Sequence, residues 1–278
     1  MATDPRGRVN RFRAVLFATA TLLSAGSAAA QDLPPVTVRV LTYNIHHGEG
    51  MDRVFDLHRL AEIMKATDPD LVALQEVDQG TQRAGGTMQL DELGKLMGMH
   101  SAFGPAMAFQ GGEYGVGVLS RWPLLDVRNR PLPTPPSYLE PRTLLTVETR
   151  VGEHGPILRF SSTHLENSRE APEERVAQAA EVNRLLAQDA RPSVLGGDFN
   201  ARAEPEIVGV LSREWTNAAT LVPFADSTRQ ARRGGARSDF ILFRPAGSWR
   251  VVEWEVIDAP VASDHRPVLA VLEWVGDS

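Results

Sequence analysis

The first patterned stretch of the chain alternates between apolar and other positions with a period of two. Residues 36–43 place Val38 and Val40 on one face and Leu41 on the opposite face. Such alternation is typical of a strand that presents two different surfaces. The pattern therefore predicts a strand that ends at Asn44.

Later segments repeat this pattern or change to the 3.6-residue spacing of a helix. Short apolar or alternating runs predict strands over 71–74, 115–119, 143–151, 157–163, 193–195, 239–243, 249–257 and 268–274. Helical spacing predicts helices over 56–66, 87–97 and 173–188, the last with Val176, Ala179, Ala180 and Leu186 facing inward. Mixed βα and ββ units of this kind indicate an α/β fold in which packed sheets carry outer helices.

The first thirty residues have the pattern of a secretory signal peptide. Four arginines precede an apolar run over 14–23, and Ala28-Ala29-Ala30 supplies a small-residue cleavage pattern. We therefore expect a signal peptide over 1–30, one domain over 31–278 and a periplasmic or extracellular location. The alternative is an uncleaved membrane anchor, although the run is short for a bilayer span. The mature chain is expected to have no transmembrane span.

Composition narrows the chemistry further. The 278-residue chain has no cysteine, which excludes disulfides, thiolate metal sites and a cysteine nucleophile. Its formal charge is −6, and removal of the leader, which carries +3, would leave −9. A surface of this charge does not favour tracking along nucleic acid, although a local basic groove would still permit a nuclease.

Polar side chains stand at the ends of the predicted strands. They are Asn44, Glu76, His164, Asp198, Asn200, Asp239, Asp264 and His265. Each alone has an ordinary explanation as a turn residue, a surface carboxylate or a hydrogen-bonded histidine. Together they place oxygen and imidazole groups where rigid strands present side chains to a shared cleft. Such oxygen donors suit Mg²⁺.

Seven segments in this order resemble the endonuclease/exonuclease/phosphatase superfamily. The matching residues are Thr42-Tyr43-Asn44-Ile45, Leu74-Gln75-Glu76-Val77-Asp78, residues 114–121, Thr163-His164-Leu165, Gly197-Asp198-Phe199-Asn200, Ser238-Asp239-Phe240-Ile241 and Ser263-Asp264-His265-Arg266-Pro267. The resemblance covers essentially the whole mature chain. It implies a four-layer α/β sandwich, with two mixed β-sheets packed face to face and helices on the outer faces.

The resemblance also implies a role for each residue. Glu76 would be the principal ligand of Mg²⁺, with Mn²⁺ as an alternative, and Asn44 and Asp264 would lie close to the metal or its waters. Asp239 would orient His265, which then serves general acid–base chemistry. The remaining catalytic roles fall to Asp198 and Asn200, which would position the attacking water, and to His164, which would donate to a phosphoryl oxygen.

Contacts with substrate are expected from Arg142, Tyr114 and His46. Arg142 resembles a family arginine that contacts phosphate, whereas Tyr114 stands where deoxyribonuclease-type members have a glutamate that partners the counterpart of His164. That departure leaves the partner of His164 open, with Glu113 as a candidate by proximity. A loop role is an equal alternative for His46 and His47. Four arginines before Asp239 are either a phosphate-binding patch or a solvated loop, namely Arg229, Arg232, Arg233 and Arg237.

The function that follows is an exported Mg²⁺-dependent phosphoesterase in which water attacks a phosphodiester or phosphomonoester. A nuclease, a lipid-headgroup phosphodiesterase and a non-catalytic binding module on the same fold are the alternatives. Nucleic acid is a less favoured partner because of the charge. The substrate and the oligomeric state are left open by the sequence.

Overall fold

The computed structural model describes residues 36–134, 140–153, 155–168, 170–201, 205–221 and 238–276. The predicted signal peptide and the four arginines at 229–237 lie outside these ranges. The description below concerns the compact unit over 35–278. None of the described helices is long and apolar enough to cross a membrane.

The first of two six-stranded sheets has the strand order β11-β12-β1-β2-β4-β3. Its members are β1 (Val36–Asn44), β2 (Leu71–Gln79), β3 (His100–Phe109), β4 (Gly112–Ser120), β11 (Trp249–Val256) and β12 (Val268–Trp274). β1 and β2 run parallel in the centre, and their pairing ends where Asn44, the last residue of β1, lies opposite Gln75 of β2. All other pairings in this sheet are antiparallel.

The second sheet has the order β5-β6-β7-β8-β10-β9. Its strands are β5 (Leu124–Pro131), β6 (Thr143–Arg150), β7 (Ile157–His164), β8 (Ser193–Asp198), β9 (Thr216–Asn217) and β10 (Asp239–Arg244). β7 and β8 form a second central parallel pair, with His164 opposite Asp198 at its end. Each sheet therefore carries one parallel pair, and the parallel pairing ends at Asn44 in the first sheet and at His164 and Asp198 in the second, three of the polar residues singled out in the sequence.

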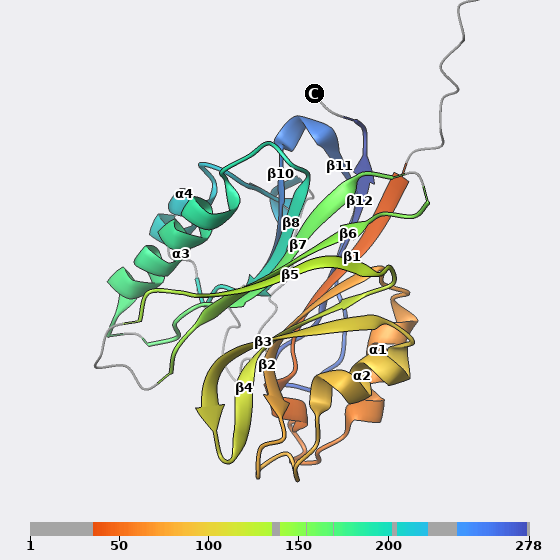
Figure 1. Cartoon of the computed structure of the whole chain (residues 1–278), viewed down its shortest axis with the longest axis vertical. Helices are drawn as coiled ribbons and strands as arrows, with labels where there is room; N and C mark the ends of the chain where they lie inside the picture. Colours follow the sequence, from red (N-terminus) through yellow and green to blue (C-terminus); the bar gives the residue numbers. More distant parts are fainter. Residues whose placement is uncertain are drawn as a thin grey trace, which may run out of the picture. The chain divides into compact units, whose positions relative to one another are not determined.

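Helices cover the outer faces of both sheets (Figure 1). α1 (Leu57–Ala66) and α2 (Gln89–Met97) pack on the first sheet, and α3 (Pro172–Leu186) and α4 (Pro205–Leu211) pack on the second. Short 3₁₀ turns complete the fold at His46–Gly48, Ala218–Leu221 and Ala246–Ser248. The predicted four-layer α/β sandwich is confirmed.

The core between the sheets follows from the alternation in the strands. Val38 and Val40 of β1 point into it, beside the fully buried Phe160 of β7. Leu41 and Tyr43, on the opposite face of β1, pack under α1 and α2. The period-two pattern thus assigns each face of β1 to a different apolar layer, as the sequence predicted.

Three details differ from the predictions. β2 does not end at Leu74 but continues to Gln79 through an irregularity between Leu74 and Val77. Ala180, predicted to face inward, is exposed on α3, and the buried positions include Arg175 and Gln178. The strands β3, β5 and β9 and the short helix α4 were not predicted.

Candidate functional site

The two parallel pairs end at one edge of the sandwich, and Asp198 lies where they meet. Asn44 Nδ2, at the end of β1 in the other sheet, donates to Asp198 Oδ2 at 3.2 Å and to Glu76 Oε1 at 2.9 Å. The backbone N–H of Asn200 donates to Asp198 Oδ1 at 2.9 Å. Residues 154 positions apart in the chain are therefore joined by one buried amide.

A β-bulge turns Glu76 towards this cluster. The pairing of β2 with β4 jumps from Leu74–Gly117 to Val77–Gly115, so two residues of β2 oppose Val116 alone. Glu76 has a positive φ of 56°, a conformation that non-glycine residues rarely adopt. Bulges near functional sites commonly redirect a side chain, and the strain is held by the surrounding ladder.

A second pair of residues adjoins Asp198 from β10 and the loop before β12. His265 Nδ1 lies 3.1 and 3.0 Å from the two carboxylate oxygens of Asp239. A carboxylate only accepts, so Nδ1 carries a proton and the ring is oriented by Asp239. The other ring nitrogen, Nε2, lies 3.5 Å from Asp198 Oδ2. Asp264 is half-buried beside His265.

Ser263 fixes the loop that carries Asp264 and His265. Its hydroxyl donates to the carbonyl of Asn44 at 2.7 Å and accepts from the backbone N–H of His265 at 3.2 Å. Ser263 is fully buried. This serine, which the sequence interpretation did not single out, therefore links the end of β1 to the histidine loop.

Two groups of the cluster, His265 and Asp198, have strongly shifted pKa values. Burial by itself would lower the pKa of His265, but the Asp239 and Asp198 carboxylates outweigh burial and raise the pKa to about 10. Burial raises the pKa of Asp198 to about 6, with Asp239 and Glu76 adding to the rise and His265 opposing it. His265 therefore holds its proton at neutral pH, whereas Asp198 lies close to its titration range.

His164 and Arg142 complete the second sheet's side of the cluster. Arg142 Nη1 lies 3.1 Å from His164 Nδ1. Arginine can only donate, so Nδ1 accepts and the neutral ring carries its proton on Nε2. That atom lies 3.5 Å from Asp198 Oδ2, which can accept its N–H. Asn200 Nδ2 is 3.2 Å from Nε2 but is itself a donor, and it donates to the carbonyl of Leu165 at 3.0 Å. Arg142, which directly precedes β6, thus occupies the place for which Glu113 was a candidate, and Glu113 is exposed.

Arg142 is a buried cation with few partners. Its side chain is 2% exposed, with Nη1 2.7 Å from Glu140 Oε1, and Nε is 3.9 Å from Glu166 Oε2. Among the described residues, Nε and Nη2 have no hydrogen-bond partner. Buried N–H groups of this kind normally find an acceptor, and phosphate oxygens match the geometry of a guanidinium.

Tyr114 lines a small cavity with Arg142 and His164. Its ring is buried on β4, and Arg83 stacks over it with the guanidinium carbon 5.5 Å from the ring centroid. Burial, together with Glu76 and Glu140, raises the pKa of the Tyr114 hydroxyl well above its usual value. The hydroxyl is therefore a neutral donor beside the cluster.

His46 and His47 lie close to Glu76, in the 3₁₀ turn after β1. One potential ligand atom from each of His46, His47 and Glu76 lies within 4.8 Å of the other two. The backbone N–H of His46 donates to Asn44 Oδ1 at 3.1 Å. Burial, together with the neighbouring Arg83 and His46, lowers the pKa of His47 to about 4, so this ring is neutral.

The donor set fits the divalent cation that the family implies. Glu76, Asn44 and Asp264 offer oxygen atoms, which are the ligands that Mg²⁺ prefers. The charge on Glu76 contributes to the raised pKa of Asp198, so carboxylates crowd together here. A cation would relieve that repulsion. The eight predicted catalytic and metal-binding residues are thus placed around one cluster, and Arg142, Tyr114 and His46 adjoin it.

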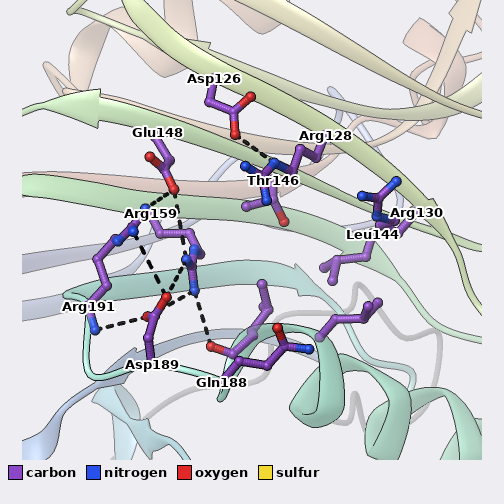
Figure 2. Close-up of a pocket in the computed structure, with 12 residues that line it drawn as sticks. Asp126, Arg128, Arg130, Leu144, Thr146, Glu148, Arg159, Gln188, Asp189 and Arg191 are labelled. Carbon is purple, nitrogen blue, oxygen red and sulfur yellow. Dashed lines mark hydrogen bonds and ion pairs between the residues drawn. The ribbon is translucent and has the colours of Figure 1, made fainter.

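A larger groove lies elsewhere and has a different character. Figure 2 shows a cavity of about 310 Å³ formed by β5, β6, β7 and the region after α3. None of the cluster residues lines it. Its arginines Arg159 and Arg191 pair with carboxylates of Glu148 and Asp189. The charges of Arg159 and Arg191 are therefore largely compensated within the groove, and none of the residues predicted for catalysis or metal binding contributes to it.

Comparison with known proteins identifies the family to which this fold and this cluster belong. The model of the endonuclease/exonuclease/phosphatase family matches residues 41–265. The chain belongs to this family, whose members are metal-dependent phosphoric ester hydrolases.

Three similar proteins illustrate the relationship. A 5'-tyrosyl-DNA phosphodiesterase of Caenorhabditis elegans is 28% identical over 70% of this chain and 52% of its own length. The Escherichia coli K12 protein YbhP is 29% identical over 58% of this chain and 66% of its own length. The chain thus spans between half and two thirds of these relatives. An endonuclease/exonuclease/phosphatase structure from Beutenbergia cavernae superimposes with a TM-score of 0.74 at 26% identity, covering 87% of this chain and 72% of that one.

Proposed function

We propose that this protein is an exported, Mg²⁺-dependent phosphodiesterase that hydrolyses its substrate by attack of water. The observation that carries the proposal is the position of Asp198. Its two oxygens are reached by Asn44 and Asn200, and the imidazoles of His164 and His265 each lie 3.5 Å from Oδ2. Groups from both sheets therefore converge on one buried carboxylate.

The two shifted pKa values support different proton-transfer roles for Asp198 and His265. Asp198, with a pKa of about 6, accepts the proton of the attacking water. A base whose pKa lies near the working pH combines availability with driving force. His265 keeps its proton and presents Nε2–H to a phosphoryl or leaving oxygen, while Asp239 holds the ring in place. This division refines the general acid–base role expected of His265.

The phosphate group is held by the remaining donors. Arg142 offers Nε–H and Nη2–H, which have no partner among the described residues. His164 offers Nε2–H, because Arg142 occupies Nδ1. A divalent cation held by Glu76, Asn44 and Asp264 would neutralise phosphoryl oxygens and stabilise the leaving oxyanion. These groups stabilise charge that grows during attack, which is the larger part of phosphoryl-transfer catalysis.

The substrate class is proposed as a phosphodiester outside the cytoplasm. The pattern of residues 1–30 supports export, and N-terminal sequencing of the protein from the periplasm or medium tests it. The mature charge of −9 argues against nonspecific binding to DNA. The similarity to a tyrosyl-DNA phosphodiesterase favours a nucleic-acid end as the second candidate.

Hydrolysis of bis(p-nitrophenyl) phosphate tests the proposal. We expect turnover with Mg²⁺ or Mn²⁺, none with EDTA, and slower turnover of the monoester p-nitrophenyl phosphate. Asp198→Asn should lower kcat by about 10²-fold or more. Asp91→Asn, which changes an exposed carboxylate on α2, is the matched control and should leave kcat unchanged. Equal rates in the two variants would contradict the assignment, and a folded wild-type protein inactive on all phosphoesters would indicate a binding module.

A further inference from the structure

The paired histidines after β1 have a ligand geometry that the proposed phosphodiesterase mechanism does not use. We infer that His46, His47 and Glu76 form a binding site for a borderline transition-metal ion, Zn²⁺ being the best match, next to the oxygen-rich site for Mg²⁺. The inference does not depend on hydrolysis, because it concerns a metal-binding equilibrium.

The distances permit one ion to contact all three side chains. One potential ligand atom of each residue lies within 4.8 Å of the other two. All three residues are partly exposed, so an ion and water can reach them. Two imidazoles and one carboxylate, with a further position open to water, form the ligand set of many catalytic zinc sites. Imidazole also selects against Mg²⁺, which prefers oxygen ligands.

Hydrogen bonding already fixes the tautomer of His46. Its Nδ1 lies 2.9 Å from the carbonyl oxygen of Glu49. A carbonyl only accepts, so Nδ1 carries the proton and Nε2 keeps its lone pair. Metal-binding histidines usually donate their other N–H to a backbone carbonyl or a carboxylate in this way. The arrangement therefore leaves Nε2 of His46 available as a ligand.

His47 has an unsatisfied nitrogen. Its Nδ1 is buried and has no hydrogen-bond partner among the described residues. The rings of His46 and His47 are close, with centroids 4.4 Å apart and planes tilted by 57°. A buried nitrogen without a partner is uncommon and calls for a ligand, a water or an ion.

The backbone holds both histidines in an unusual conformation. His46 and His47 have φ values of 45° and 44°, in the left-handed region that costs energy for residues with a Cβ. Gln89, at the start of α2, secures the turn. Its Nε2 donates to the carbonyl of His47 at 2.6 Å, and its Oε1 accepts from the backbone N–H of Asp78 in β2 at 2.9 Å. Gln89 thus ties the histidine turn to the strand that carries Glu76.

Glu76 would then lie between two ions of different character. Asn44 donates to Glu76 Oε1 at 2.9 Å and to Asp198 at 3.2 Å, and one carboxylate oxygen of Glu76 also lies within 4.8 Å of a nitrogen from each of the two histidines. A carboxylate shared in this way is the usual bridge in two-metal phosphoesterase sites. The histidine site would be the selective one, because only it contains nitrogen ligands.

Metal titration of the tag-free full chain tests the inference. In isothermal titration calorimetry, the wild-type protein should bind Zn²⁺, and His46→Asn and His47→Asn should each weaken binding at least about tenfold. Asparagine tolerates a positive φ, so both variants should fold. His58→Asn changes an exposed histidine on α1 and is the matched control. Mg²⁺-induced thermal stabilisation should persist in all three variants.

X-ray absorption of the Zn²⁺-loaded wild type provides a readout that needs no variant. We expect scattering from two imidazole rings and from oxygen. Oxygen neighbours alone, wild-type Zn²⁺ affinity in both His46→Asn and His47→Asn, or an absence of Zn²⁺ binding would each overturn the inference. Loss of phosphodiesterase activity with intact Zn²⁺ binding would instead count only against the proposed function.

Discussion

The spacing of the two sheets beneath the cluster should control both stability and activity, and Gly196 offers the sharpest test. Gly196 lies in β8, two residues before Asp198. A Cβ added at this position would lie 2.8 Å from Cβ of Ala73 in β2 and 3.2 Å from Cβ of Thr42 in β1. The sheets therefore approach closely here because one of the facing residues has no side chain.

The cost of Gly196→Ala can be worked from these distances. Carbon atoms pack at about 3.5–4.0 Å, so the facing strands must separate by roughly 0.8 Å. Ala73 is fully buried and both neighbours belong to strands, so the structure has little freedom to adjust. Overpacking of this size costs about 1–3 kcal/mol. A shift approaching 1 Å at Asp198 should also lower kcat/KM by up to about 10²-fold.

A compensating substitution separates crowding from other effects. Ala73→Gly removes the methyl group that the new Cβ would meet. The double variant should therefore be more stable than the sum of the single changes predicts, by about 0.5–3 kcal/mol. Gly209→Ala on α4 is the control, because nothing lies within 4 Å of an added Cβ there.

Urea denaturation and hydrolysis of bis(p-nitrophenyl) phosphate measure the two consequences. We expect Gly196→Ala to lower the free energy of unfolding and the rate, and the double variant to recover part of both. If Gly196→Ala is as stable as the wild type, or if the two changes are strictly additive, the sheet-spacing argument is wrong.

Three further predictions concern single residues. Arg142→Gln should raise KM and lower kcat for phosphodiesters by about 10²-fold or more, measured by steady-state kinetics, since it removes a buried phosphate donor and the hydrogen bond to His164. Ser263→Ala should lower the free energy of unfolding by about 1–3 kcal/mol in urea titrations, because the buried carbonyl of Asn44 loses its donor. Phe160→Ala should destabilise the fold by about 3–5 kcal/mol in the same assay, since its fully buried ring leaves a cavity between the sheets.

The central strands could be predicted because their apolar pattern is strong. β1, β6, β7, β8, β10 and β12 lie within one or a few residues of the expected ranges. The missed strands β3, β5 and β9 are all at sheet edges. β3 contains Gly104-Pro105 and β5 contains charged residues, features that edge strands tolerate and that hide a strand from pattern analysis.

Non-local partners account for the remaining differences. Ala180 was expected to face inward because it is apolar, yet α3 buries Arg175 and Gln178 instead. Arg175 donates to the carbonyl of Glu166 at 2.8 Å, and Gln178 donates to that of Pro133 at 3.0 Å. Buried polar side chains become acceptable once such partners exist, and the partners lie in loops outside α3, nine and 45 residues away in the sequence.

Prediction of the site is also limited by contacts between residues from different elements. Strand ends can be found in a sequence, so the residues of the cluster could be named in advance. Their contacts could not, because the bulge at Glu76 depends on the register with β4, and the bond from Arg142 to His164 depends on the pairing of β6 with β7. The role of Gln89 was missed for the same reason, since it joins two segments 42 residues apart.

The balance of charge in this cluster favours the binding of a cation. Glu76, Asp198, Asp239 and Asp264 bring four carboxyl groups together, whereas His265 is the protonated group paired directly with two of them. Removing carboxylates from water is costly unless a positive charge compensates them. Burial raises the pKa of Asp198, and the neighbouring carboxylates of Asp239 and Glu76 add to the rise. A divalent ion would compensate the negative charge of the carboxylates. Because its binding would relieve their repulsion, the metal would stabilise the folded protein.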